Sequence, residues 1–352
     1  MTPPPSNRAT VEALAQKWGG LLPTLALVGV AAVWGATFVI VADAVANYPL
    51  YAFLGIRFVI ASVAFLAFFP KVFRRVSTRE LRLGIPAGIF LAAGYITQTM
   101  GLLPVQQGGT TAARAAFLTG MYVVIVPILS SIFRRITPNW GNIAGVVLAL
   151  AGTWFMSGIA NAGSGTWVVG DTWVLASAFA FSGHMLVLGR ANETHDTLGL
   201  TILQLIIVAL ITSVASVITG EGASLPSGPA AGQLWFALLL TGVLASAVAF
   251  VVQTWAQQVL VPSRVALILI SEPAFGGVIG WLVAGSAPVP EVVGASLMMT
   301  GMVVSEIVSA KQAERRGEPL DLAMEGAPVY VQDKDLYRDE VIEEMEEDLG
   351  EA

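Results

Sequence analysis

A glutamate and a proline stand side by side in the middle of a long apolar stretch of this sequence. Glu272 and Pro273 interrupt the run "LILISEPAFGG". A carboxylate is expensive in lipid unless it is protonated or paired, and proline removes a backbone donor and breaks a helix locally. Both are tolerable where the segment faces a polar cavity. We therefore expect Glu272 to line a cavity and exchange a proton, with a helix break at Pro273. The alternative is a carboxylate that pairs with Arg264 or caps its helix.

Two arginines also fall in apolar blocks. Arg57 lies eight residues after Pro49, about 12 Å along a helix. Its guanidinium could bind a carboxylate through two parallel hydrogen bonds, or it could anchor the fold by bonding to backbone carbonyls or to Asp43. Arg114 stands near the start of a later block, where it either extends into the headgroup region or attracts anions at the mouth of a cavity.

Uncharged polar and aromatic residues complete the set of candidates. Gln253 and Gln257 are one helical turn apart on one face, and Gln98 stands in an earlier block. These amides could line a binding cavity or form hydrogen bonds between helices. His184 is either a packed core histidine or a proton relay, and Trp34 fits a packing or cavity-wall position.

The composition indicates the elements that must position these residues. The chain has 352 residues, of which 55% are hydrophobic and 12% charged, with a mean hydropathy of +0.74. The apolar residues form blocks of about 20, the length that crosses a bilayer as a helix. The sequence predicts an all-α integral membrane protein with ten transmembrane helices, at 21–42, 49–69, 83–103, 112–133, 143–159, 172–188, 198–219, 234–260, 265–283 and 292–308.

Several kinds of chemistry are disfavoured. The chain has no cysteine and only two histidines, His184 and His195, neither with a carboxylate at metal-ligand spacing. It has no glycine-rich phosphate loop and no spacing of a nucleophile and a base. We therefore expect no enzyme activity, no cofactor, no metal and no nucleic-acid partner. The expected partners are membrane lipid and a small molecule, while the oligomeric state is left open.

The basic residues indicate an orientation. If the N-terminus is cytoplasmic, every Lys and Arg between the predicted spans falls in a cytoplasmic loop, which is the arrangement found in plasma (inner) membrane proteins. Fourteen of the 24 acidic residues follow Lys311, so the net charge of −6 mainly describes the tail. We expect this tail to be disordered. The alternative is a short acidic helix that docks on a partner through Ile342, Met345 and Leu349.

The chain also contains a weak internal repeat. A shift of 147 residues places Trp34 on Phe181 and Arg57 on Gln204. Similar shifts place Gln98 of "YITQT" on Gln253 of "FVVQT", and Pro127, a second predicted helix break, on Pro273. Five spans in each half give the halves opposite orientations, which is an inverted repeat. The predicted organisation is an N-terminal cytoplasmic segment (1–20), two five-helix repeats (21–160 and 161–310) and an acidic cytoplasmic tail (311–352).

Five stretches resemble one known family, the ten-helix EamA-type branch of the drug/metabolite transporter superfamily. They are "AAVWGATFVI", "LGIRFVIA", "AAFLTGMYVVIVPIL", "GDTWVLASAFAFSGHMLVLGR" and "ALILISEPAFGG" with the following "VIG". The resemblance implies alternating-access transport, often export, of amino acids or other small metabolites. One departure is the absence of the Leu-Gly-Glu setting that family members often carry after the ninth span; this chain has "VAGSA" there.

These observations favour a secondary transporter that exports a small metabolite, an amino acid or related compound or a drug, across the plasma membrane. Since no ATP-binding motif is present, a proton or sodium gradient is the expected energy source. Glu272 and His184 are the coupling candidates, and Arg57, Gln98, Arg114, Gln204, Gln253, Gln257 and Trp34 are the substrate-binding or cavity candidates. The alternative function is a channel, or a non-transporting scaffold or sensor whose acidic tail recruits partners; an intramembrane enzyme is a third.

The predicted orientation can be tested with reporter fusions. A reporter that is active only outside the cytoplasm should be silent when fused after Val308, and active when placed in the loop "EGASLPSG", because the basic residues hold both termini inside. The opposite pattern of activity would contradict a cytoplasmic N-terminus.

Overall fold

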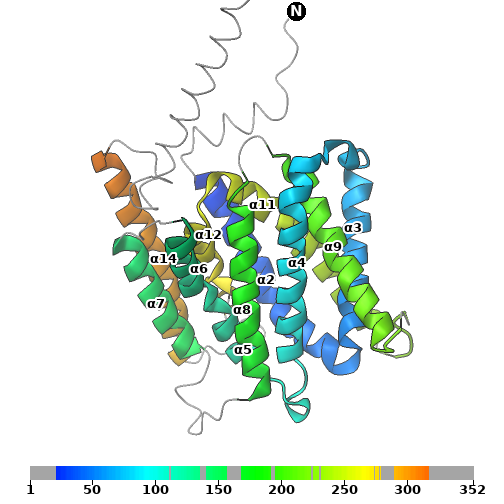
Figure 1. The fold of residues 1–352 in the computed structure, drawn as a ribbon. Helices are drawn as coiled ribbons and strands as arrows, with labels where there is room; N and C mark the ends of the chain where they lie inside the picture. Colours follow the sequence, from blue (N-terminus) through cyan, green and yellow to red (C-terminus); the bar gives the residue numbers. More distant parts are fainter. Residues whose placement is uncertain are drawn as a thin grey trace, which may run out of the picture.

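The protein folds as a single bundle of helices (Figure 1). The computed structural model describes residues 21–110, 112–134, 140–156, 168–191, 195–222, 225–229, 231–272, 274–276, 278 and 289–316. All regular elements of this part are helical. Helices are expected here because a bilayer offers no partner for free backbone groups, and a helix satisfies these groups within one segment.

The first half of the chain contains α2 (Leu21–Asn47), α3 (Leu50–Phe68), α4 (Thr78–Gly101), α5 (Ala112–Gly120), α6 (Tyr122–Arg134) and α7 (Trp140–Met156). Two short 3₁₀ turns, η1 (Val72–Arg75) and η2 (Val105–Gln107), lie in its loops. The second half contains α8 (Val169–Leu188), α9 (Thr197–Ile218), α10 (Ala231–Leu239), the π-helical segment η3 (Leu240–Val248), α11 (Ala249–Val259), α12 (Pro262–Leu269) and α14 (Val289–Arg316).

The all-helical membrane fold predicted from the sequence is confirmed. Within the described residues, six helices are long and apolar enough to cross a membrane, and they correspond to predicted spans one, two, three, six, seven and eight. Shorter apolar helical stretches, Leu118–Ser130, Ile143–Gly152 and Val292–Ser305, fall in spans four, five and ten. Span four is divided into α5 and α6, and in span nine α12 ends at Leu269.

Equivalent helices of the two halves pack in matching ways. The second spans pack on each other (α3 with α9), as do the fifth spans (α7 with α14) and the fourth and ninth (α6 with α12). The third span of the first half packs on the first span of the second half (α4 with α8), and the reverse pair, α11 with α2, is also in contact. This exchange is what two halves related by a pseudo-two-fold axis produce.

Span four is interrupted at a position other than the predicted one. Pro127 lies inside α6, and the interruption is at Met121, next to Gly120. The prediction of a break at Pro127 is therefore corrected. The proline cannot donate to Val123 and its ring crowds the preceding turn. That turn is tightened, with the Val124 amide bonding to the Met121 carbonyl at 3.0 Å. The helix is therefore interrupted at the end of this turn, next to Gly120, because glycine is a weak helix former.

Span nine is interrupted in the middle, as the sequence suggested. After α12, the amide of Ser271 bonds three residues back to Ile268, and Ile270 and Ser271 form a turn directly before Glu272. Pro273 itself lies outside the described residues. The turn places Glu272 at the start of the next helical stretch.

Span eight contains a feature that its sequence pattern does not predict. Its middle, η3, is wound as a π-helix between α10 and α11. In this segment the Ala245 carbonyl accepts a hydrogen bond from Trp34 Nε1 at 2.8 Å. Span eight is thereby linked to α2.

Helix α2 makes an unusually close backbone contact with span nine. A β-carbon at Gly35 would collide with the Glu272 carbonyl oxygen and lie 2.8 Å from the Gly276 amide nitrogen. Glycine is required here because only a hydrogen fits between the two backbones. The contact fixes the part of span nine that carries the Glu272 side chain.

We predict that Gly35→Ala destabilises the protein by about 1–3 kcal/mol, the usual cost of forcing atoms into a packed contact. Gly29→Ala is the matched control on the same helix, because a β-carbon at Gly29 would meet no atom within 4 Å. The measurement is the thermal unfolding midpoint of the two purified variants in detergent. Equal midpoints would show that the contact at Gly35 is looser than described.

Candidate functional site

One cavity collects most of the polar side chains that the sequence singled out. It is lined by residues of α2, α3, α4, α5, α6, α8, α11, α12 and the start of the second part of span nine. Six predicted site residues are in its wall: Trp34, Arg57, Gln98, His184, Gln253 and Glu272. The rest of the wall is formed by Thr37, Phe38, Val41, Leu91, Tyr95, Thr99, Leu102, Thr119, Tyr122, Phe181, Met185, Phe250 and Leu269.

Arg57 is buried in the cavity wall with hydrogen-bonding capacity to spare. Its Nε donates to Ser246 Oγ of the π-helical segment at 3.1 Å, and its Nη2 is 3.4 Å from the Tyr95 hydroxyl. The guanidinium carbon lies 4.7 Å from the centre of the Tyr95 ring, within cation–π distance. No carboxylate of the described residues forms an ion pair with Arg57, and Asp43 is exposed. The guanidinium is thus held in place while several N–H groups remain available.

Aromatic rings form much of the remaining wall. Tyr95 makes edge contacts with Phe181 and Phe250, with ring centres 5.6 and 6.1 Å apart. Trp34 packs against Phe250 at 5.6 Å. Such rings are rigid and apolar, so they form a defined surface for the uncharged body of a ligand.

His184 is held in one tautomer by a residue behind the cavity wall. Gln204 donates through Nε2 to the Leu200 carbonyl at 3.0 Å and to Thr254 Oγ1 at 3.3 Å. Its Oε1 therefore faces His184 Nε2, at 2.7 Å, and accepts from it. The proton is then on Nε2, which leaves Nδ1 as a hydrogen-bond acceptor.

Gln253 is fixed by a similar relay along α11. Its Nε2 donates to Gln257 Oε1 at 3.2 Å, and Gln257 donates in turn to the Met185 carbonyl at 2.9 Å, next to His184. Gln253 Oε1 is buried and accepts no hydrogen bond from any described residue. A buried acceptor without a donor is costly, so this atom is suited to a donor group on a bound molecule.

Glu272 is the cavity's carboxylate. It is 9% exposed, and its side chain forms no ion pair or hydrogen bond with the described residues. The alternative pairing with Arg264 does not occur among them; Arg264 Nη2 donates to Thr24 Oγ1 at 3.2 Å instead. The cavity therefore carries a guanidinium and a carboxylate, neither of which is neutralised by a protein partner in the described part of the chain.

Two predicted cavity residues are placed elsewhere. Gln204 and Gln257 are buried behind the wall, where they orient His184 and Gln253 as described. Arg114 belongs to α5, but its side chain lies outside the described part of the structure. Gln98 is in the wall as expected, with its Nε2 donating to Thr119 Oγ1 at 3.2 Å.

Sequence reasoning missed Tyr95, Ser246 and the phenylalanines of the wall. Tyr95 had a usable signal, because it precedes Gln98 by three residues and shares its helix face. Ser246 had none, since its position depends on the π-helical turn. The phenylalanines could not be distinguished from ordinary packing residues by their type.

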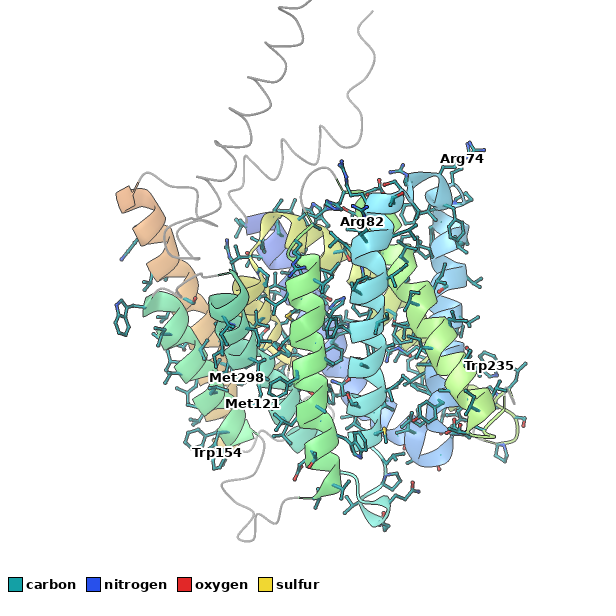
Figure 2. All side chains as sticks on the ribbon, in the orientation of Figure 1. Arg74, Arg82, Met121, Trp154, Trp235 and Met298 are labelled. Atoms are coloured by element: carbon teal, nitrogen blue, oxygen red, sulfur yellow. The ribbon has the colours of Figure 1, made fainter. Side chains whose placement is uncertain are left out.

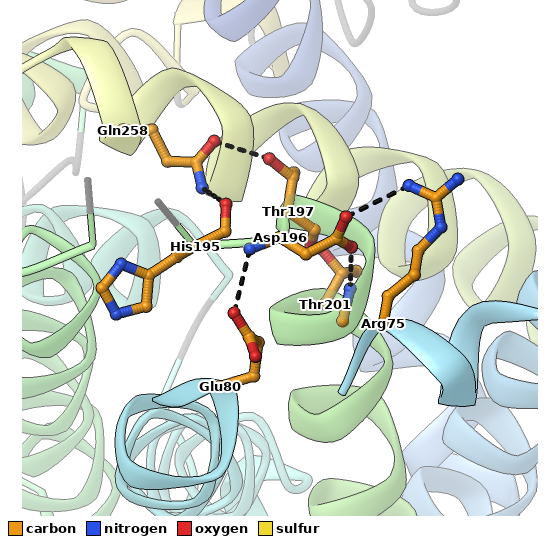
Figure 3. A network of polar contacts seen from close by, with 8 residues as sticks. Arg75, Glu80, His195, Asp196, Thr197, Thr201 and Gln258 are labelled. Atoms are coloured by element: carbon orange, nitrogen blue, oxygen red, sulfur yellow. Dashed lines mark hydrogen bonds and ion pairs between the residues drawn. The ribbon is translucent and has the colours of Figure 1, made fainter. Parts of the chain in front are cut away.

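Polar contacts hold one end of the bundle together (Figure 3). This end contains η1, the start of α4 and the end of α14. We call it the basic end because η1 and the start of α4 carry several arginines. Asp196 joins its elements: its side chain pairs with Arg75 at 3.1 Å, and its amide donates to Glu80 Oε1 at 3.1 Å. Gln258 of α11 bonds to Thr197 Oγ1 at 2.6 Å and to the His195 carbonyl at 2.9 Å. The cavity takes its lining from the halves of α2 and α4 that lie away from this end.

Comparisons with known proteins agree with this architecture. The model of the EamA-like transporter family matches the chain twice, at residues 21–158 and 168–306. An uncharacterized transporter of Archaeoglobus fulgidus is 27% identical over 285 residues, which cover 81% of this chain and 85% of that protein. A solved crystal structure superposes with a TM-score of 0.67 at 16% identity, covering 82% of this chain and 98% of that one; at this identity the likeness concerns the fold alone.

The tautomer of His184 provides a test of the site geometry. Because the chain has only two histidines, ¹⁵N-histidine spectra of the protein in lipid contain two sets of ring signals, and His195→Asn assigns them. We predict that His184 carries its proton on Nε2, and that Gln204→Leu removes this preference while Thr212→Val, a change on the same helix, does not. A proton on Nδ1 in the unmodified protein would contradict the hydrogen-bond chain.

Proposed function

The chain belongs to the EamA-like transporter family, and we propose that it is a secondary carrier that exports a small metabolite, an amino acid or a related compound, across the plasma membrane. The supporting observation is the cavity that holds Arg57 and Glu272. Charges at membrane depth are rare and costly, and they normally mark a substrate or ion pathway. A zwitterionic molecule with an apolar body would meet Arg57 with its carboxylate and the acceptor atoms of Glu272, Gln253 and His184 with its donor groups.

Alternating access suits the distribution of contacts along the bundle. The cavity takes its lining on α2 and α4 from the halves away from the basic end, and the Asp196 and Gln258 contacts join α4, α9 and α11 at that end. If the basic end is cytoplasmic, as the distribution of Lys and Arg predicts, these contacts join the helices on the cytoplasmic side of the bundle. A carrier must then break these contacts to expose the same cavity to the cytoplasm. A channel would instead need a path through both ends at once.

The proposed coupling ion is a proton, with sodium as the alternative. Glu272 supports the proton because a carboxylate without a protein partner in a largely apolar cavity can be protonated and released as the cavity opens and closes. The turn directly before Glu272 interrupts the helix of span nine, which supports a movement of this group during the transport cycle. His184 is the second proton-binding candidate, and Gln204 would hold its ring in position.

We predict that Glu272→Gln abolishes proton-driven transport while the protein remains in the membrane at normal abundance, because the neutral amide keeps the shape of the side chain but cannot exchange a proton. The measurement is uptake of a panel of labelled amino acids into liposomes under an imposed pH gradient. Asp43→Asn is the matched control, since Asp43 is an exposed acidic residue of α2 outside the cavity wall. Gradient-driven uptake by the Glu272→Gln variant that equals the unmodified protein would end the coupling proposal and favour another group or sodium.

A further inference from the structure

A groove at the basic end is lined by cations and hydroxyl groups. Its walls are the start of α4, the end of α8 and the residues that precede α9. The charged lining residues are Arg79, Arg82 and Arg190, joined by His195, and the remaining lining residues are Ser77, Thr78 and Leu83. No acidic residue of the described chain is part of this lining.

The carboxylates near the groove are engaged in other contacts. Glu80 is buried and accepts hydrogen bonds from the Ser77 and Asp196 amides at 2.9 and 3.1 Å. Asp196 pairs with Arg75 and also accepts from the Gly199 amide at 2.8 Å. The three groove arginines are exposed and form no ion pair with the described residues, so their charge is available for a ligand.

The chain itself carries a segment of the opposite charge. Thirteen acidic and two basic residues follow Arg316, the last residue of α14, and seven of the acidic residues fall within the last thirteen positions, 340–352. Helix α14 and the start of α4 reach the same end of the bundle (Figure 1). The segment after Arg316 has 36 residues, with a root-mean-square reach of about 30–36 Å as a flexible chain and about 120 Å when extended. The groove is within this reach.

We propose that the acidic tail, residues 317–352, docks in the arginine groove of its own chain. The tail presents carboxylates in runs, and each arginine can bind a carboxylate through paired hydrogen bonds. Docking places the tail against α4 and α8. The tail then lies beside the contacts of Asp196 and His195 that hold the helices together at the basic end. The family match ends at residue 306, so this interaction is a property of this chain beyond the transporter fold, and it does not depend on the identity of the substrate.

The absence of cysteine makes the proposal directly testable by crosslinking. One cysteine replaces Thr78 in the groove and a second replaces Met345 in the acidic run, in the full-length protein with a protease site inserted behind Arg316. After treatment with a short bismaleimide and cleavage, a crosslinked tail stays attached to the bundle. We expect efficient crosslinking that falls at high salt, because salt screens exposed charge pairs. A cysteine at Arg74, which lies well away from Arg82 at the same end (Figure 2), should crosslink poorly to position 345.

Two double charge variants distinguish docking of the tail in the groove from an unspecific attraction between the acidic tail and other basic residues at this end. Arg79→Gln with Arg82→Gln should lower the crosslinking yield about three- to tenfold, the effect of losing two exposed charge pairs. Lys71→Gln with Arg74→Gln removes the same charge from the same end outside the groove and should leave the yield unchanged. Equal losses in the two double variants, or no loss in either, would overturn the proposal.

The remaining occupant to test is an anionic lipid headgroup, which also binds arginine at membrane surfaces. The crosslinking is therefore repeated in nanodiscs of phosphatidylcholine alone and of phosphatidylcholine with phosphatidylglycerol. Similar yields in both membranes, with the same dependence on Arg79 and Arg82, support the tail. Crosslinking that occurs in phosphatidylcholine and disappears with phosphatidylglycerol would assign the groove to lipid and overturn the proposal.

Discussion

The structure depends on the placement of two charged side chains, Arg57 and Glu272, at the depth of the membrane. Each charge would cost at least about 2.5–3.5 kcal/mol if it faced lipid. Both instead lie in the wall of one cavity. The guanidinium is held by Ser246 and Tyr95, and the carboxylate follows a turn in span nine. The π-helical segment of span eight and the turn in span nine lie next to these two groups. Irregular backbone in a membrane is tolerated where it lines a cavity or is covered by protein.

The two halves of the chain share a topology but have diverged at the cavity. Arg57 and Gln204 occupy equivalent positions in the repeat, yet Arg57 is in the cavity wall and Gln204 lies behind it, bonded to His184. Spans four and nine are both interrupted, but only span nine has a carboxylate at its interruption. In the proposed carrier, a symmetric scaffold with an asymmetric lining would bind one molecule in a defined orientation while the two halves move against each other.

Much of this arrangement follows from the sequence. Apolar blocks of about 20 residues predicted the all-helical membrane fold, since a helix of that length is needed to cross a bilayer. Polar and charged residues in those blocks predicted five of the six cavity residues, because a polar group at membrane depth has few other places to lie, and Trp34 is the sixth. The predicted position of the break in span four was wrong. Pro127 lies inside α6 and affects the turn before it, and the helix is interrupted at Gly120 and Met121. The π-helical turn of span eight, and with it the role of Ser246, depends on packing against α2 and α3 and has no signal in local residue types.

The central claim is that Arg57 serves a bound molecule rather than the stability of the fold, and one variant tests it directly. Arg57→Met keeps the volume of the side chain and removes its charge. The measurement compares the thermal unfolding midpoint of the purified variant with its flux in liposomes. We predict an unchanged or higher midpoint, because a buried charge is replaced by an apolar group, together with the loss of substrate flux. A lower midpoint, with the surviving protein transporting at the normal KM, would contradict the claim and make Arg57 a structural anchor.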